Sequence, residues 1–123
     1  MNRELKFRIW CKTMQLWLCE DSQFLQMDGK RVHAASWSTI EFDLPNENYI
    51  IQQYTGLKDS KGVEIYEGDI VEIGDRKREV IFNIGMFYID ENYGDIVPVS
   101  EVDNIIEVIG NIFENPELIK NNE

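Results

Sequence analysis

Three carboxylates stand close together in the segment EIYEGD: Glu64, Glu67 and Asp69. Paired carboxylates perform general acid and base chemistry when burial or a neighbouring charge drives their pKa values apart. The strand alternation that follows, however, sends Asp69 to the same face as Val71. An aspartate at the start of a strand commonly accepts backbone N–H bonds from the preceding turn. The sequence therefore favours a structural role for Asp69 over a catalytic one.

Residues 90–101, DENYGDIVPVSE, have the spacing of a calcium-binding loop in part. Asp90 and Asn92 alternate, and Glu101 is the twelfth residue. The sharp turn of such a loop needs glycine where Asp95 stands, and the flanking segments read as strands instead of helices. We therefore expect an ordinary turn without calcium.

Cysteine and histidine chemistry has few residues to draw on, namely Cys11, Cys19 and His33. Together they cannot supply the four ligands of a structural zinc site, and no spacing links His33 to a nucleophile. The phosphate-binding patterns GxxxxGK[ST] and GxGxxG do not occur. We expect reduced cysteines, no metal, no cofactor and no catalytic activity.

The segment QYTGLKDSKGVEIYEGDIVEI, residues 53–73, is the strongest candidate for a binding site. Asp59 and Gly62 have the spacing of the first and fourth residues of a type I turn, and a second turn is expected at Glu67 and Gly68. Strand periodicity does not explain the string that precedes the first turn. The predicted binding residues are Tyr54, Thr55, Gly56, Lys58, Tyr66 and Asp69.

The net charge of −11 is unevenly distributed along the chain. Residues 1–45 carry six basic and six acidic side chains, whereas residues 46–123 carry six basic and seventeen acidic ones. So negative a surface repels phosphate backbones, which argues against nucleic acid as the partner, and it permits a basic protein. The basic run Arg76, Lys77 and Arg78 is expected to tip a hairpin as a solvated loop.

Period-two alternation dominates the chain and predicts a mainly β fold. The first strand is expected to be half-buried and the last to be buried on both faces. CKT and Asp28-Gly29 are expected to be hairpin turns, the second because Asp-Gly is a turn signal. Strands are expected at 4–11, 14–18, 38–45, 49–56, 69–74, 78–85, 86–90 and 105–113.

Helix is predicted at two places. Ser100 to Asp103 fits a capping box, and Asn115 is expected to cap a short terminal helix that has Pro116 at its first position. At 123 residues the chain is expected to be a single domain, 1–123, made of an amino-terminal β region, 1–45, and a second part, 46–123. No apolar run approaches the roughly 20 residues of a membrane helix, and a secretory signal is not evident, so we expect no membrane and a cytoplasmic location.

Three blocks of the chain resemble the YopX family of phage and prophage proteins of Gram-positive bacteria: LKFRIW, QYTGLKDSKGVEIYEGDIV at 53–71, and IEVIGNIFENPEL at 106–118. The chain departs from the family at CKT, where an acidic turn is usual. The resemblance implies a mainly β fold with an SH3-like barrel in the second part, and a host bacterial cytoplasm. It implies no reaction and no site residues, and a barrel of this kind serves many roles.

The leading functional hypothesis is a non-enzymatic phage accessory protein that binds a host or phage protein through its acidic second part. One alternative is an inhibitor that imitates DNA and blocks a nucleic-acid enzyme. The other is a nucleic-acid-binding barrel that uses Lys58, Lys61 and the run Arg76 to Arg78.

Overall fold

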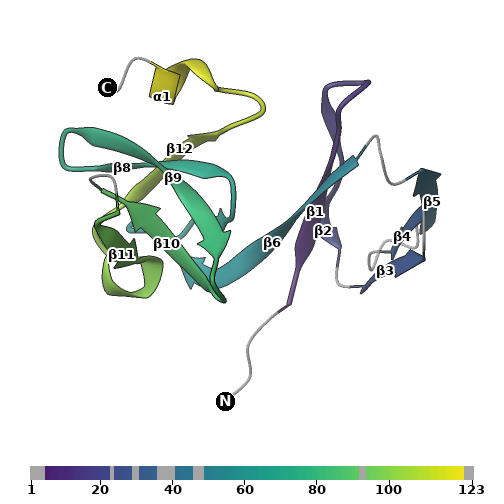
Figure 1. Ribbon diagram of the computed structural model, residues 1–123, viewed down its shortest axis with the longest axis horizontal. Coiled ribbons are helices and arrows are strands. Elements are labelled where there is room, and N and C mark those ends of the chain that lie inside the picture. The colour runs from purple at the N-terminus through teal and green to yellow at the C-terminus, as the bar shows by residue number, and fades with distance from the viewer. Residues whose placement is uncertain are drawn as a thin grey trace. The chain divides into compact units, whose positions relative to one another are not determined.

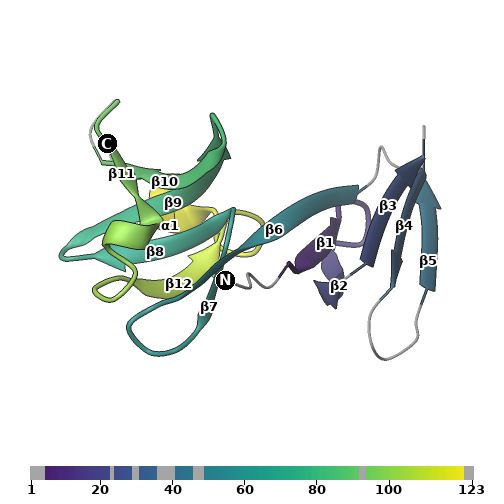
Figure 2. The same ribbon diagram turned by 90° about the horizontal axis from the view of Figure 1, so that it is seen from below.

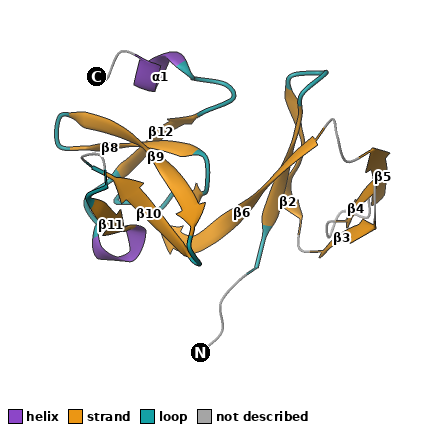
Figure 3. Cartoon of the chain, in the orientation of Figure 1, coloured by secondary structure: helices purple, strands orange, loops and turns teal. Residues whose placement is uncertain are grey.

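The computed structural model describes residues 5–22, 24–28, 31–35, 41–45, 49–91 and 94–120, and the side chains of 5–17, 49–91 and 94–119. Strands account for most of these residues (Figure 3), so the predicted mainly β fold is confirmed. The chain divides into two compact units, Met1–Tyr54 and Thr55–Glu123. The boundary lies inside one long strand, β6 (Tyr49–Lys58), which Figure 2 shows as the longest ribbon.

The first unit contains two antiparallel arrangements of strands. In one, β1 pairs with β2 on one side and with β6 on the other. In the other, β4 lies between β3 and β5. The strands are β1 (Phe7–Cys11), β2 (Leu16–Ser22), β3 (Phe24–Asp28), β4 (Arg31–Ala35) and β5 (Glu41–Pro45).

Strand β1 is buried on both faces, so the expectation of a half-buried strand was wrong. Arg8, Ile9, Trp10 and Cys11 are all at most 9% exposed. β1 is buried on both faces because it lies between β2 and β6, and because its buried cation, Arg8, has a polar partner. The guanidinium Nε of Arg8 donates to Oε1 of Gln52 at 2.9 Å.

Both predicted hairpins of the first unit occur. The first turn spans residues 12–15 instead of CKT, and it places Met14 in the turn and Gln15 at φ +55°. The second hairpin joins β3 to β4, in the register Asp28↔Arg31. Its turn residues, 29–30, lie outside the described part of the chain, as do the side chains of Cys19 and His33.

The second unit is built on a five-stranded antiparallel sheet in the order β11-β10-β9-β8-β12, and β7 adds to the sheet of β6. Figure 1 shows that the five-stranded sheet is strongly curled. The strands are β7 (Glu64–Tyr66), β8 (Asp69–Ile73), β9 (Arg76–Asn83), β10 (Met86–Asp90), β11 (Ile96–Pro98) and β12 (Glu107–Asn111).

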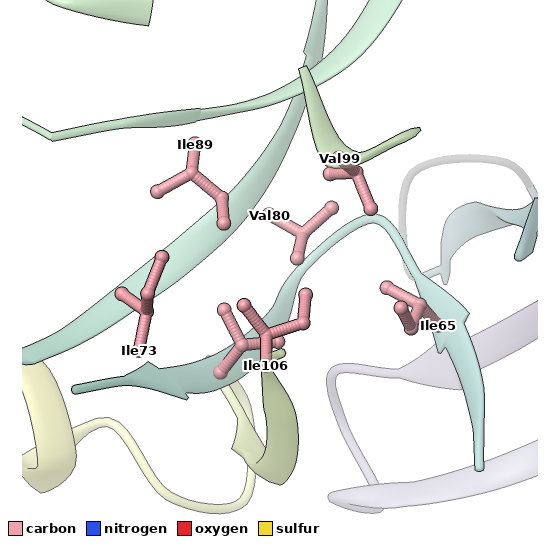
Figure 4. Close-up of a cluster of buried hydrophobic side chains, with 7 residues drawn as sticks. Ile65, Ile73, Val80, Ile89, Val99 and Ile106 are labelled. Carbon is pink, nitrogen blue, oxygen red and sulfur yellow. The ribbon is translucent and has the colours of Figure 1, made fainter. Parts of the chain in front are cut away.

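Curling lets one face of the sheet enclose an aliphatic core (Figure 4). The buried members come from β7, β8, β9, β10, the segment at Val99 and the residue before β12, and all are β-branched, which suits a pleated surface packed on itself. Burying seven such side chains is the main favourable contribution to the folding of this unit. They are Ile65, Val71, Ile73, Val80, Ile89, Val99 and Ile106.

Two strand predictions need correction. Strand β6 does not turn at Gly56 but continues through it, with φ +87°, to Lys58. Strand β12 is not buried on both faces: it is an outer strand of the sheet, and Val108 is partly buried. Of the two apolar residues that precede β12, Ile106 enters the core and Ile105 faces solvent.

The two predicted helical segments are short. A 3-10 helix, η2 (Val99–Glu101), has Pro98 as its N-cap and no side-chain capping bond, so the predicted capping box at Ser100 was wrong. The terminal helix is α1 (Glu117–Lys120), and it lies against β9. Among the described residues no helix is long and apolar enough to cross a membrane.

Candidate functional site

The predicted binding string lies in the second half of β6. Tyr54, the last residue of the first unit, is buried, and the Lys6 ammonium lies 5.2 Å from its ring centroid. Thr55 is buried as well, and its hydroxyl oxygen accepts the Leu57 N–H at 3.1 Å. Lys58 is exposed. The string therefore combines buried structural side chains with one solvent-facing cation, and binding by these residues stays a prediction.

Asp59 bonds to its own turn and to a distant strand through one buried side chain. The residue is 6% exposed, and its carboxylate accepts three backbone N–H groups, from Lys61 at 2.8 Å, Val63 at 2.9 Å and Val108 at 2.8 Å. The Gly62 N–H donates to the Asp59 carbonyl at 3.1 Å, which confirms the predicted four-residue turn. One side chain thus closes its own turn and joins that turn to β12.

The ionised form of Asp59 is favoured despite burial. Burial alone raises the pKa of a carboxyl group, but the N–H groups of Val108, Val63 and Lys61, helped by the Lys61 charge, outweigh it. The pKa of Asp59 consequently lies below its ordinary value of 3.8. A carboxylate held ionised by backbone donors is a structural anion and a poor proton donor or acceptor at neutral pH.

The second predicted turn, at Glu67 and Gly68, is also confirmed. Oδ2 of the buried Asp69 accepts the Tyr66 N–H at 2.8 Å, and Gly68 has φ +84°. The Gly68 N–H donates to the Val80 carbonyl, and the Gly68 carbonyl accepts the Ile112 N–H. Asp69 therefore has the structural role predicted for it, because its carboxylate closes the turn that enters β8.

A third polar arrangement follows β12. The buried Asn111 accepts the N–H groups of Phe113 and Glu114 on Oδ1 and donates from Nδ2 to the Glu114 carboxylate at 2.8 Å. Oδ1 of Asn115 accepts the Asn111 N–H at 3.2 Å, so Asn115 does not cap α1 as predicted. Sequence reasoning missed Asn111, although an asparagine just before a turn is a known local signal.

The basic run is not a solvated loop, and that prediction was wrong. The hairpin turn is Gly74 and Asp75, and the basic residues begin β9. Arg76 pairs with Glu91 at 2.7 Å, and Nε of Arg78 lies 3.5 Å from the same carboxylate. Sequence reasoning missed the pairing of these two cations with Glu91, because Glu91 is distant in sequence and becomes their neighbour only across the sheet.

Glu79, on β9, lies opposite Ile70, and burial raises its pKa above the ordinary value of 4.5. A group whose folded-state pKa lies above its unfolded pKa contributes stability that is fully present at low pH. This contribution is lost as the pH rises through the folded-state pKa. Ionised Glu79 therefore costs stability at pH 7. We expect Glu79→Gln to stabilise the protein at pH 7, with the gain disappearing below about pH 4.

Urea unfolding of Glu79→Gln and the wild type at pH 7 and at pH 4 tests this expectation. Glu72→Gln, on the neighbouring β8, is the matched control for the loss of one carboxylate from the same sheet. A loss of stability at pH 7 in Glu79→Gln would show that the charged carboxylate stabilises the fold.

The calcium-like loop behaves as a turn. The Gly94 N–H donates to Oδ1 of Asp90 at 2.8 Å, and β10 and β11 flank the loop. Asn92 lies outside the described residues. Within the part of the chain that the structure describes, no three His, Cys, Asp or Glu residues are grouped to hold a metal ion.

The fold and these contacts define the class of this protein. It is a small, mainly β protein in which buried carboxylate and carboxamide groups accept hydrogen bonds from the backbone of turns and strands. The chain belongs to the YopX family, because the family model described as "YopX protein" matches residues 6–120. No curated protein matches the chain.

Two solved structures resemble the chain over nearly its whole length. Protein EF1440 from Enterococcus faecalis is 26% identical with a TM-score of 0.68, and the match covers 97% of this chain and 100% of that one. Protein yopX from Bacillus subtilis is 22% identical with a TM-score of 0.63, covering 94% and 98%. The family is of uncharacterised function, so membership supports the fold and assigns no reaction.

Proposed function

We propose that this protein is a non-enzymatic binding module of phage or prophage origin, which acts in the bacterial cytoplasm by contacting a basic host or phage protein. The observation that carries the proposal is the charge of the second unit. Residues 55–123 contain sixteen acidic and six basic side chains. Complementary charge speeds encounter with a basic partner and disfavours acidic ones.

The environment of the two buried aspartates supports a non-enzymatic role. Asp59 and Asp69 are buried and accept backbone N–H groups, which leaves their carboxylates committed to turns. For the second unit we propose an SH3-like barrel. Its support is the curled antiparallel sheet and the 3-10 helix that precedes the last strand. Such barrels host many unrelated functions, so this fold is compatible with a binding role and does not by itself select one.

Capture from a bacterial lysate at two salt concentrations tests the binding role. The tagged protein should retain an identifiable basic protein at about 50 mM salt and lose most of it at about 500 mM, because salt screens exposed charges. A variant with four exposed carboxylates neutralised, Asp75→Asn, Asp95→Asn, Glu101→Gln and Glu117→Gln, should bind at least about tenfold more weakly. Retention of the partner by that variant, or no partner at low salt, would contradict the proposal.

The alternatives give different results in the same assay. An inhibitor that imitates DNA would capture a nucleic-acid enzyme and be displaced by added DNA. A nucleic-acid-binding barrel would retard DNA or RNA in a gel at about 50 mM salt, where phosphate contacts are strongest. The pairing of Arg76 and Arg78 with Glu91 counts against this last function, because those cations are already neutralised in part.

A further inference from the structure

The hairpin formed by β9 and β10 ends in a segment without charge. Residues 80–89, VIFNIGMFYI, contain no acidic or basic side chain, although 28% of the whole chain is charged. Strand β9 pairs with β8 from Arg76 to Glu79, whereas it pairs with β10 from Val80 to Asn83. The uncharged part of the hairpin therefore extends past the paired part of β8 (Figure 1).

Apolar side chains at the end of this hairpin face solvent. Ile84 is 72% exposed and Phe82 is 46% exposed. Phe82 lies directly opposite Phe87, and their ring centroids are 4.7 Å apart. We call Phe82, Ile84 and Met86 the apolar tip; Phe87, which packs against the core, supports Phe82 from below. Aromatic residues and methionine with little charge are the composition of the central part of a protein interface.

The backbone at Ile84 indicates that folding alone does not select this residue. Ile84 has φ +48° and Gly85 has φ +76° in a two-residue turn between Asn83 and Met86, which is the signature of a type I′ turn. Its first position favours Asn, Asp or Gly, and a β-branched residue there is strained. An outlier that costs stability and displays an apolar side chain points to binding.

We propose that the apolar tip inserts into an apolar recess of a partner protein whose rim carries lysine and arginine; this proposal rests on the binding function proposed above. Charge selects this occupant. Glu79 and Asp90 flank the uncharged segment, and the second unit has sixteen acidic and six basic side chains. A second copy of the chain, a nucleic acid or an anionic membrane would be repelled, whereas a basic rim is attracted.

Photo-crosslinking locates the contact. The full-length protein with the substitution Met86→benzoylphenylalanine is irradiated in a Bacillus subtilis lysate at about 50 mM salt, and the crosslinked peptides are identified by mass spectrometry. The expected product is a heterologous protein joined at an apolar site bordered by Lys or Arg. Crosslinking to a second copy of the chain, to an acidic surface or to nothing would overturn the proposal.

A matched pair of substitutions separates binding from folding. Ile84→Asn should weaken retention of the captured protein at least about tenfold, as loss of an interface anchor does, and should raise Tm by about 2–6 °C because Asn accepts positive φ. Ile105→Asn is the control, since Ile105 is 61% exposed in a different turn. It should change neither binding nor the crosslink.

The two proposals fail in different ways. Capture by the wild type that survives Ile84→Asn would overturn the apolar tip and leave the binding function standing. Absence of any salt-sensitive partner with the wild type would overturn both. A fall in Tm with Ile84→Asn would remove the argument from strain even if binding were lost.

Discussion

Asp59→Ala is expected to destabilise the protein by about 2–4 kcal/mol, because it removes a buried carboxylate that accepts three backbone N–H groups. Two of these donors, Lys61 and Val63, belong to the turn that Asp59 opens. The third, Val108, lies 49 residues away on β12. Urea unfolding measures the total cost. Amide hydrogen exchange should show lost protection at Val63 and Val108.

The substitution Asp59→Asn separates the bonds that the carboxylate makes within its own turn from its bond to β12. Its single amide oxygen can still accept the Lys61 and Val63 N–H groups, and asparagine is favoured in such turns. Its NH₂ group would then face the Val108 N–H, donor against donor. We therefore expect a cost of about 1–3 kcal/mol, with protection lost at Val108 and retained at Val63.

The pH dependence of stability provides an independent readout. The folded-state pKa of Asp59 lies below 3.8, so its stabilisation is present above the unfolded pKa and is lost as pH falls through the folded pKa. Both Asp59 variants should therefore lose less stability than the wild type between pH 5 and pH 2. The control Asp95→Asn, at an exposed position, should stay within about 0.5 kcal/mol of the wild type. Parallel pH profiles for Asp59→Asn and wild type would contradict the role assigned to this carboxylate.

Local patterns in the sequence were enough to predict most strands and both turns of residues 53–73. Alternation is a short-range property, and a glycine at positive φ or an aspartate before a turn acts within a few residues. The buried faces were harder to predict. Alternation predicted a half-buried first strand, but a hydrogen bond to Gln52, on the neighbouring strand, lets Arg8 be buried there as well. The partner is 44 residues away, so no local window contains both.

The candidate segment illustrates the same limit. The sequence placed Asp59 in a turn, but its bond to Val108 depends on sheet pairing that periodicity does not specify. Glu91 was missed as the partner of Arg76 for that reason. The apolar tip had a usable signal, which was an isoleucine before a glycine in a two-residue hairpin loop within an uncharged run. It was overlooked because Ile84 also continues the alternation of Val80 and Phe82.

The residue-specific blocks 53–71 and 106–118 are joined by hydrogen bonds in the structure. Asp59 and Ser60 bond to the backbone of Val108 and Ile106, and Gly68 bonds to Ile112. Each bond links a turn of the first block to β12 or to a residue next to it in the second. Only the Asp59 bond uses a side chain, so closure of this sheet edge accounts for the choice of Asp59.

The second large effect is expected at Gly110, where Gly110→Ala should cost about 2–3 kcal/mol. Gly110 follows the register shift in β12, which begins after Val108. A Cβ built at Gly110 would lie 2.5 Å from Oδ1 and 2.9 Å from Cβ of Asn115, so Asn115 would have to move. Movement of Asn115 would break its bond to the Asn111 N–H. The loss is steric and local, since Gly110 is not among the positive-φ glycines.

A double-mutant cycle with Asn115→Ala isolates this contact. Asn115→Ala alone should cost about 1–2 kcal/mol, because it leaves the Asn111 N–H without its acceptor. In that background the carboxamide is gone, but the Cβ of residue 115 stays 2.9 Å from the added methyl group, so Gly110→Ala should cost less than in the wild type, about 1 kcal/mol. A coupling energy of about 1–2 kcal/mol is therefore expected from urea unfolding of the four proteins. Additive costs would mean that Gly110 is required by the bulge backbone and not by Asn115.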